Sequence, residues 1–389
     1  MLLQKPAFLL FYHARAAEAS FGEWLGVLWH GLSLDCTVAG YVTAFPVLVV
    51  LASFWIPLSQ RVWRIVLTVY FSLIALVTAA IFAVDLNLYG YWGFRLDGSV
   101  LIYLSDPGEA LASASWGEVL RQILIMLVYA GAMIWSYRWI LRLFRVEPVP
   151  LRGRVVPTVA ALLIGGLTFL AIRGGVTVAT ANVSKVYFSS NMFLNHAATN
   201  PVFSFLSSVG DNENYAEAYP FFEEERRKTL FEELRGNRPG ADAGTPRLLR
   251  SDRPNVVLIL LESFGRTIMD ETVNGEPVMP NMQRFKREGV WFENFFANSF
   301  RTDRGQVAVL CGFPAQTTMS IMKLPRKSAT LPSLARSLGR EGYRSVFMYG
   351  GDLNFTNQAS FMYSTGWEEL IWQKDMQLDA PTSKWGYAD

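Results

Sequence analysis

Two oxygen-bearing side chains occupy positions in this chain where they could do chemistry. Glu262 follows directly on the apolar run 255–261, and Thr302 stands about forty residues later, after an aromatic segment. An unpaired carboxylate is costly to bury, and a divalent cation offsets that cost because hard cations prefer carboxylate oxygens. Alternatively, Glu262 faces solvent or caps the next helix.

The Thr302 hydroxyl has two interpretations. Thr is a preferred helix cap, so Thr302 or Asp303 could simply begin a helix expected over 302–310. The position also suits a nucleophile, because a helix N-terminus offers N–H donors and the positive dipole end to a phosphate. A hydroxyl attacks well only when a base or a metal removes its proton, and a cation shared with Glu262 would do so.

Five further polar residues could contact a bound phosphate or its ester group. They are Arg301, Arg304, Asp352, Asn354 and Asn357. The two arginines could make charge-assisted hydrogen bonds to phosphate oxygens, or they could be solvated surface residues. The other three follow a Gly-Gly pair and could line a pocket or stabilise a turn.

The elements that must position these residues fall into two different parts. The 389 residues are 51% hydrophobic and only 17% charged, with a mean hydropathy of +0.22, whereas about a quarter charged residues is usual in soluble proteins. The deficit lies before residue 173. We therefore predict a transmembrane anchor over 1–172, an extracytoplasmic linker over 173–253 and a catalytic region over 254–389.

Four apolar stretches are long enough to cross a bilayer, which takes about 20 residues. They are residues 37–57, 63–84, 119–141 and 155–172. A fifth, Pro6–Tyr12, is too short to span alone and is either interfacial or part of a longer span. Because the four stretches hold few ionisable residues, anchoring is favoured over transport.

Basic residues in the short loops predict the orientation. Arg61 and Arg64 flank one loop, four arginines stand in 142–154, and the intervening loop 85–118 is acidic. Basic loops face the cytoplasm, so everything after Arg173 is expected outside. The predicted location is the cell (inner) membrane, multi-pass, with an extracytoplasmic catalytic domain.

Beyond the spans, the pattern predicts an α/β region. Helices are expected over 221–236, 279–289, 302–310 and 331–342, and strands over 253–265 and 343–351, with a strand or an extended segment over 290–299. The first strand reads as buried on both faces, as in a parallel sheet. Since chemistry gathers at the carboxyl ends of such strands, Glu262, Thr302 and Asp352 are expected to converge. The segment 195–209 is expected to pack at the outer membrane surface, and 236–253 to form an exposed tether.

Charge and cysteine content exclude some classes of protein. The net charge is +2 and no long basic tract is present, so no nucleic-acid partner is expected. Cys36 and Cys311 lie in different parts of the chain and have no metal or redox spacing.

Several motifs together point to a family. NVVLILLESF at 255–264, RTDRG at 301–305, GFPAQ at 312–316 and GYRSVFMYGGD at 342–352 resemble the lipoteichoic acid synthase and phosphoglycerol transferase group. This group belongs to the alkaline phosphatase and sulfatase superfamily. The resemblance covers roughly 250–389, and the preceding multi-span anchor fits the same architecture. The implied fold is an N-terminal multi-span α-helical membrane domain followed by an incomplete α/β sulfatase-like domain.

The resemblance also implies a reaction. Glu262 would be a metal ligand, and Thr302 both a ligand and the nucleophile. The metal would be manganese or magnesium, with zinc used by related phosphoethanolamine transferases. A phosphoglycerol-type head group would move from a membrane lipid donor, through a phosphothreonine, to an extracytoplasmic glycan or polymer acceptor.

Two departures from the family pattern matter. The family site also needs an Asp-His pair and a further His, but His13, His30 and His196 all precede the catalytic region. We therefore expect a chain truncated within that region and inactive alone. In addition, Thr356 and Gln358 stand where the resemblance would place Trp and Arg, which leaves phosphoethanolamine open as the head group.

Two other classes of function remain. A sulfatase-type hydrolase needs Cys or Ser in a C/S-x-P-x-R motif, whereas after Cys311 the proline comes one place late and the arginine is missing. A non-catalytic membrane protein is the second alternative, and the missing histidines favour it.

Overall fold

The computed structural model describes most of the chain. The described residues are 2–98, 100–101, 115–145, 150, 153–209, 221–235, 251–316, 319–380, 382–383 and 386–387. Much of the predicted acidic loop 85–118, part of the basic loop 142–154 and most of the predicted tether 236–253 lie outside these residues.

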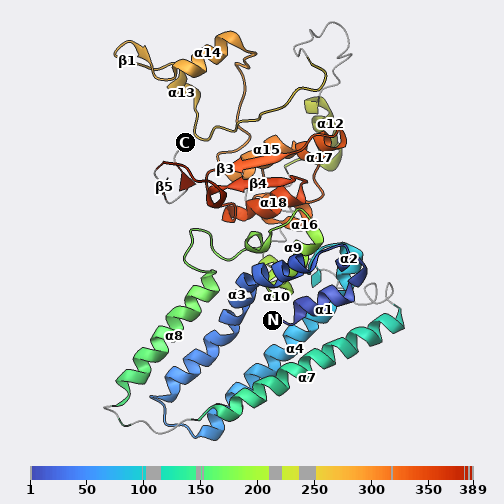
Figure 1. Ribbon diagram of the computed structural model, residues 1–389, viewed down its shortest axis with the longest axis vertical. Coiled ribbons are helices and arrows are strands. Elements are labelled where there is room, and N and C mark those ends of the chain that lie inside the picture. Colours follow the sequence, from blue (N-terminus) through green and yellow to red (C-terminus); the bar gives the residue numbers. More distant parts are fainter. Residues whose placement is uncertain are drawn as a thin grey trace. The chain divides into compact units, whose positions relative to one another are not determined.

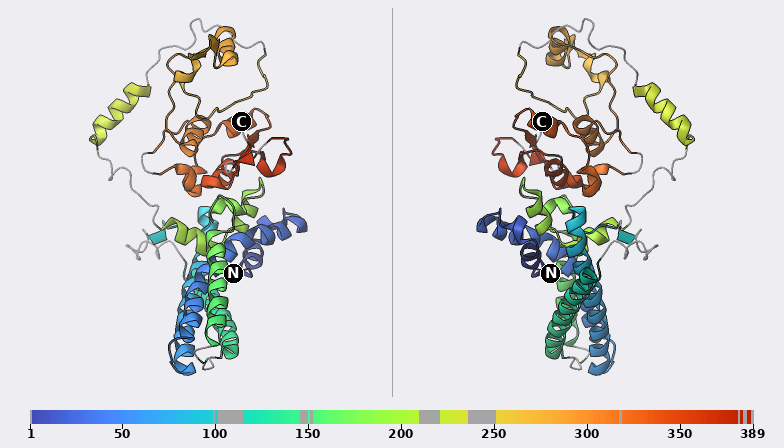
Figure 2. Two further views of the ribbon diagram at one scale, coloured as in Figure 1. Left: turned by 90° about the vertical axis from the view of Figure 1, so that its left-hand side faces the viewer. Right: turned by 90° about the vertical axis from the view of Figure 1, so that its right-hand side faces the viewer.

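Four helices are long and apolar enough to cross a membrane, by length and composition. They are α3 (Phe21–Ser53), α4 (Gln60–Trp92), α7 (Trp116–Leu143) and α8 (Val155–Arg173). Helix α4 packs along α7, and α3 along α8 (Figures 1 and 2). The four predicted apolar stretches are confirmed as long helices, although α3 begins well before residue 37.

Local sequence accounts for where these helices begin and end. Ser20 and Glu23 form a capping box at the start of α3, and Ser115 and Glu118 form one at the start of α7. Helix α4 ends at Gly93, whose φ of 69° favours glycine.

Short helices cover one end of the long ones. They are α1 (Gln4–Phe11), α2 (His13–Ala16), η2 (Val183–Val186), α9 (Met192–Ala198) and α10 (Pro201–Ser208). Their apolar side chains form a buried core with α3 and α4, including Phe8, Leu34, Phe82, Leu194 and Val202. The segment 195–209 therefore packs against the membrane helices instead of linking freely.

Two ion pairs lie inside this core. Lys5 Nζ is 2.6 Å from Asp35 Oδ2, and Asn200 Nδ2 donates to Asp35 Oδ1 at 2.7 Å. Arg95 lies 3.1 Å from Asp85. The pair at Lys5 requires glycine at position 31, because a Cβ there would stand 2.0 Å from Lys5 Cε. These contacts fasten the N-terminal helix across α3.

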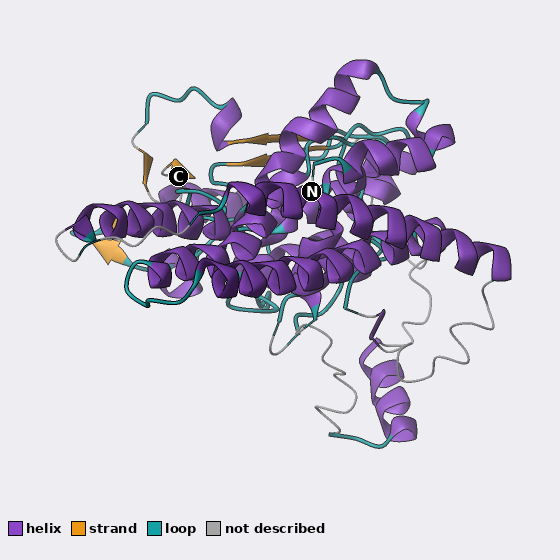
Figure 3. Cartoon of the chain, turned by 90° about the horizontal axis from the view of Figure 1, so that it is seen from below, coloured by secondary structure: helices purple, strands orange, loops and turns teal. Residues whose placement is uncertain are grey.

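The segment after residue 302 has its own small core. Its elements are α15 (Thr302–Cys311), η3 (Ile321–Lys323), α16 (Pro325–Ser328), α17 (Leu334–Arg340), β3 (Val346–Tyr349), η4 (Phe355–Asn357), α18 (Gln358–Ser364), β4 (Glu369–Trp372), η5 (Gln373–Asp375), β5 (Thr382–Ser383) and β6 (Gly386–Tyr387). Strands β3 and β4 are parallel, with Val346 opposite Glu369, and α18 lies between them in sequence. The core residues include Val307, Leu310, Met322 and Phe361. This is the expected parallel α/β arrangement, although helices dominate the molecule (Figure 3).

The described residues between 221 and 301 contain few regular elements. These are α12 (Glu224–Arg235), α13 (Arg266–Met269), β1 (Thr272–Val273), β2 (Glu276–Pro277) and α14 (Pro280–Glu288). The predicted helices over 221–236 and 279–289 are confirmed, as are those over 302–310 and 331–342.

Two predicted strands are wrong. Residues 254–261 belong to no helix or strand, and Val257 is 82% exposed. Residues 290–299 form turns and irregular backbone. A strand buried on both faces requires flanking strands, and the described residues supply none to the run 254–261.

Contacts divide the chain into two compact units. One contains residues 1–212 and 303–389, and the other residues 213–302. This division differs from the three predicted sequence ranges, which stay a prediction.

Candidate active site

Glu262 and Thr302 lie side by side. The Thr302 hydroxyl donates a hydrogen bond to Glu262 Oε2, with 2.7 Å between the oxygens. Thr302 is the first residue of α15, so the helix start expected there is confirmed. The described hydrogen bond of its side chain goes to the carboxylate.

The backbone after Glu262 turns sharply. Ser263 has a φ of 62°, in the left-handed region that residues with a Cβ seldom adopt. Gly265 N closes the turn on Ser263 O at 3.0 Å. Such a conformation costs on the order of 1 kcal/mol or more and recurs at functional sites. The turn sets the direction of the chain immediately beside the carboxylate.

Both residues of the pair are accessible. Glu262 is exposed and Thr302 is half-buried. The carboxylate is therefore not buried, as the alternative that Glu262 faces solvent predicts. The pair can instead be reached by a substrate or an ion.

The two arginines beside Thr302 differ in their surroundings. Arg301 is exposed, whereas Arg304 is only 8% exposed. Arg304 and Asp303 are among the buried residues of α15. The alternative that both arginines are solvated surface residues is therefore wrong for Arg304.

Asp352 and Asn354 form a turn that the sequence anticipated. Asp352 Oδ1 accepts hydrogen bonds from Asn354 N at 2.9 Å and from Asn354 Nδ2 at 2.8 Å. Asn357 lies a few residues later, buried, with a φ of 66°. Its Nδ2 donates to Lys323 O at 3.4 Å. The described hydrogen bonds of Asp352 and Asn354 stabilise the turn, whereas Asn357 Oδ1 is buried without a hydrogen-bond partner among the described residues.

The segment after the last long helix contacts this turn, which sequence reasoning missed. Asn182 Nδ2 donates to Asn354 O at 2.7 Å, and Ser360 N donates to Ser184 Oγ at 3.1 Å. Burial lowers the pKa of the neighbouring Lys185, and the Asp352 carboxylate opposes that shift. The sequence signal that could have drawn attention to this segment is Asn182, whose side chain caps η2 by accepting from Ser184 N.

The side-chain oxygens of Glu262 and Thr302 are donor atoms of the type that a hard divalent cation binds. A carboxylate and a hydroxyl are the donors that magnesium and manganese accept. Among the described residues, no group of three or more His, Cys, Asp or Glu side chains is placed to hold a metal. The pair is thus suited to be part of a coordination shell and needs further donors.

The three histidines stand elsewhere in the chain. His196 Nδ1 lies 3.1 Å from the Tyr89 hydroxyl, inside the core that the short helices form with α3 and α4. His30 stacks on Phe188 with ring centroids 4.5 Å apart, and His13 belongs to α2.

Comparison with known proteins identifies the C-terminal region. Residues 254–387 match the sulfatase family. Over these residues the chain is similar to that family. The matched residues include Glu262, Thr302 and the turn at Asp352. The fold expected from the sequence, a membrane-helix part followed by a sulfatase-like region, is confirmed.

Curated relatives match the same region. Phosphoglycerol transferase I of Xanthomonas campestris pv. campestris (strain B100) is 36% identical over 124 residues, covering 30% of this chain and 17% of the relative. Lipoteichoic acid synthase 1 of Bacillus subtilis (strain 168) is 31% identical over 130 residues, covering 30% of this chain and 19% of the relative. The chain thus spans under a fifth of the length of these relatives. No solved structure matches the chain significantly.

These likenesses agree with the family that the motifs indicated. The four long apolar helices add that the sulfatase-family region belongs to a membrane protein. The names of the relatives support a transferase of the sulfatase superfamily.

Proposed function

We propose that this protein is a membrane-bound transferase that moves a phosphoglycerol-type head group from a lipid donor to an extracytoplasmic glycan or polymer acceptor. The observation that carries the proposal is the 2.7 Å hydrogen bond between Thr302 and Glu262. It supports an activated hydroxyl within a region that resembles phosphoglycerol transferase I and lipoteichoic acid synthase 1.

In the first step, Thr302 Oγ1 attacks the phosphorus of the lipid head group. A bond forms between Oγ1 and phosphorus, and the bond from phosphorus to the diacylglycerol oxygen breaks. The hydroxyl proton passes to Glu262 Oε2, which already accepts its hydrogen bond. The departing diacylglycerol oxygen takes up a proton, which leaves a phosphothreonine carrying glycerol.

In the second step, a hydroxyl of the acceptor attacks the same phosphorus. The bond to Thr302 Oγ1 breaks, the acceptor hydroxyl loses its proton, and Oγ1 regains one. The threonine is therefore restored and the head group is joined to the acceptor. Two displacements at one residue explain how a single hydroxyl serves a donor and an acceptor in turn.

Glu262 and Thr302 would also hold the divalent metal that this chemistry uses. Manganese or magnesium is proposed, with zinc as the alternative known for related phosphoethanolamine transferases. When bound, the metal supplies positive charge that favours the deprotonated hydroxyl and the phosphate oxygens. Because the pair provides two donors, the proposal requires further ligands.

The remaining predicted residues are proposed to bind the substrate. Arg301 is exposed beside Thr302 and is suited to a charge-assisted contact with phosphate. Arg304, Asp352, Asn354 and Asn357 would act through the elements that they order. The proposed location is the inner membrane, with the sulfatase-family region on the extracytoplasmic side.

The test is a search for the covalent intermediate. Membranes containing the protein are incubated with phosphatidylglycerol labelled in its head group, and tryptic peptides are analysed by mass spectrometry. The expected result is glycerophosphate on Thr302, no label in Thr302→Ala, and reduced label in Thr302→Ser. Thr330→Ala, a change at an exposed threonine of the same region, should leave labelling unchanged.

Other outcomes would count against the proposal. Full labelling in Thr302→Ala would remove Thr302 as the nucleophile. Hydrolysis of the donor without any covalent species would favour a hydrolase instead. Cys311 is a poor candidate for that chemistry, because burial raises the pKa of its thiol to about 11.

A further inference from the structure

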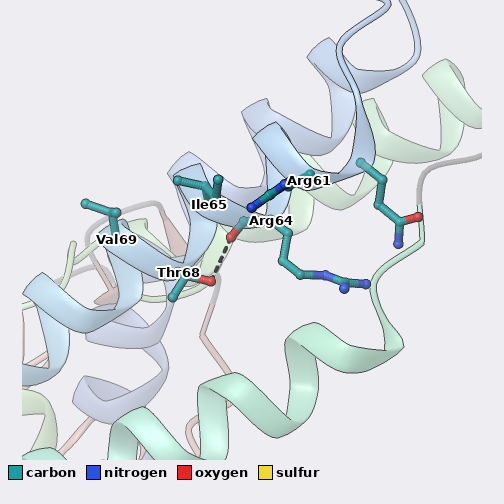
Figure 4. A pocket seen from close by; sticks show the side chains of 6 residues that line it. Arg61, Arg64, Ile65, Thr68 and Val69 are labelled. Carbon is teal, nitrogen blue, oxygen red and sulfur yellow. Dashed lines mark hydrogen bonds between the residues drawn. The ribbon is translucent and has the colours of Figure 1, made fainter.

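A groove with basic and apolar walls lies at the start of α4. Its volume is about 450 Å³, and it is lined by Gln60, Arg61, Arg64, Ile65, Thr68 and Val69. Figure 4 shows the five labelled side chains following one another along α4, with the Thr68 hydroxyl bonded to Arg64 O at 2.7 Å. None of these residues takes part in the proposed reaction.

The lining residues form one stripe of the helix. Positions 61, 64, 65, 68 and 69 are spaced three and four apart, so they share a face. The two arginines stand in the first turns, and Ile65 and Val69, 54% and 64% exposed, follow. At about 1.5 Å per residue, Arg61 and Val69 are about 12 Å apart along the axis. Each polar layer of a bilayer is about 5–8 Å deep, so the stripe spans head groups and the first acyl carbons.

The charge of the groove is not neutralised by its described neighbours. Arg64 Nη2 donates to Phe144 O at 3.3 Å, and Gln60 Nε2 donates to the same oxygen at 3.2 Å. A carbonyl oxygen carries no net charge, so this hydrogen bond does not neutralise the positive charge of the Arg64 guanidinium. Residues 54–72 and 136–145, all described, contain no Asp or Glu. An anion at this end of the helix pair therefore meets favourable charge and two fork-shaped donors.

We propose that this groove binds the phosphate of an anionic phospholipid in the adjoining leaflet. Arg61 and Arg64 contact the phosphate oxygens, and an acyl chain lies along Ile65 and Val69. A free phosphate ion would use the arginines alone and would leave the apolar half of the stripe without a ligand. The continuous basic-to-apolar surface therefore favours the lipid. The inference does not depend on the proposed transferase activity.

The test measures lipid retention on the delipidated full chain by native mass spectrometry. The probes are dioleoylphosphatidylglycerol and dioleoylphosphatidylcholine, and the variant is Arg61→Gln/Arg64→Gln. The matched control is Arg142→Gln/Arg154→Gln, which removes the same charge at the ends of α7 and α8. Loss of two charge-assisted contacts should weaken phosphatidylglycerol retention by about tenfold or more. The control should change it less than about twofold.

Two further arms keep the proposal open to refutation. Unchanged phosphatidylcholine retention in Arg61→Gln/Arg64→Gln would show that the variant is folded and that the loss is specific. Millimolar inorganic phosphate should not displace phosphatidylglycerol, and displacement would overturn the lipid as the ligand. Equal losses of phosphatidylglycerol retention in the variant and the control would overturn the proposal that the groove binds the lipid, because general surface charge would then account for binding.

Discussion

Thr302 Oγ1 and Glu262 Oε2 are 2.7 Å apart although forty positions separate them in sequence. The contact joins the start of α15 to the end of an extended apolar segment. It gives the hydroxyl an acceptor for its proton and leaves both side chains within reach of solvent. This pair is therefore the centre of the chemistry proposed for the chain.

The negative charge of Glu262 is predicted to matter more for transfer than the shape of its side chain. Glu262→Gln keeps an oxygen near Thr302 but removes the carboxylate that would accept a proton and bind a cation. Transfer is expected to fall by about a hundredfold or more, as for loss of a catalytic base. Manganese binding to the purified protein, followed by electron paramagnetic resonance, should weaken as well. Glu293→Gln, another exposed glutamate of the sulfatase-family region, serves as the control, and equal effects of both changes would refute a special role for Glu262.

The bond from Asn182 to the Asn354 carbonyl is predicted to hold the turn at Asp352 in place. Asn182→Asp keeps the oxygen that caps η2 but removes the donor, at a cost of about 1 kcal/mol. Limited proteolysis within 350–361 should become faster. Asn191→Asp keeps the oxygen that accepts from Phe193 N, so its cleavage rate should match the unmodified protein. Equal rates in all three proteins would show that the bond does not restrain the turn.

The buried pair of Lys5 and Asp35 is predicted to be sensitive to the loss of one partner. Asp35→Asn leaves an uncompensated ammonium among residues of α1 and α3, which should cost about 3–5 kcal/mol. The melting temperature in detergent should fall accordingly. Lys5→Met/Asp35→Leu removes both charges and should recover much of the loss. A double variant as unstable as Asp35→Asn would show that packing, and not charge, is responsible.

Acid is predicted to destabilise the helices around His196. Burial lowers the pKa of His196 to about 3, with Arg95 and Arg15 adding to the shift. The unfolded chain then binds one more proton than the folded chain between about pH 3 and pH 6.5. Stability should therefore fall as the pH decreases through this window, by up to about 1.4 kcal/mol per pH unit from this residue.

A matched variant isolates that contribution. His196→Gln cannot titrate, so the difference in unfolding free energy between the two proteins should vary with pH below about 6.5 and be constant above it. The measurement is chemical unfolding at several pH values. A constant difference across the whole range would show that the pKa of His196 is the same in the folded and the unfolded chain.

Much of the architecture was predictable from local sequence. The four long helices follow from apolar stretches of about 20 residues, the length of helix that crosses a bilayer. Capping residues such as Ser20 and Ser115 mark where two of them begin. Gly-bounded amphipathic segments gave α12 and α14, and the run at 346–349 gave β3. For the helices the interactions that decide the structure lie within a few residues, whereas β3 also needs its partner β4.

The predictions that failed concern segments whose structure depends on residues far away in the sequence. The run 254–261 has the composition of a central strand, but its state depends on strands that must lie on both sides, and the described residues provide none. Composition could not reveal that Lys5 would be buried against Asp35, or that Asn182 would bind Asn354. Those contacts join segments separated by many residues.

The sequence by itself determined four apolar stretches long enough to cross a membrane, a C-terminal region similar to the sulfatase family, and Glu262 and Thr302 as candidate site residues. Helix length, hydropathy and motif order are properties of neighbouring residues, so they can be read along the chain. Only the tertiary structure decided that the hydroxyl and carboxylate meet at hydrogen-bonding distance, that Arg304 is buried while Arg301 is exposed, and that Glu262 is accessible. Distances and burial arise from packing between segments far apart in sequence, and no local pattern encodes them.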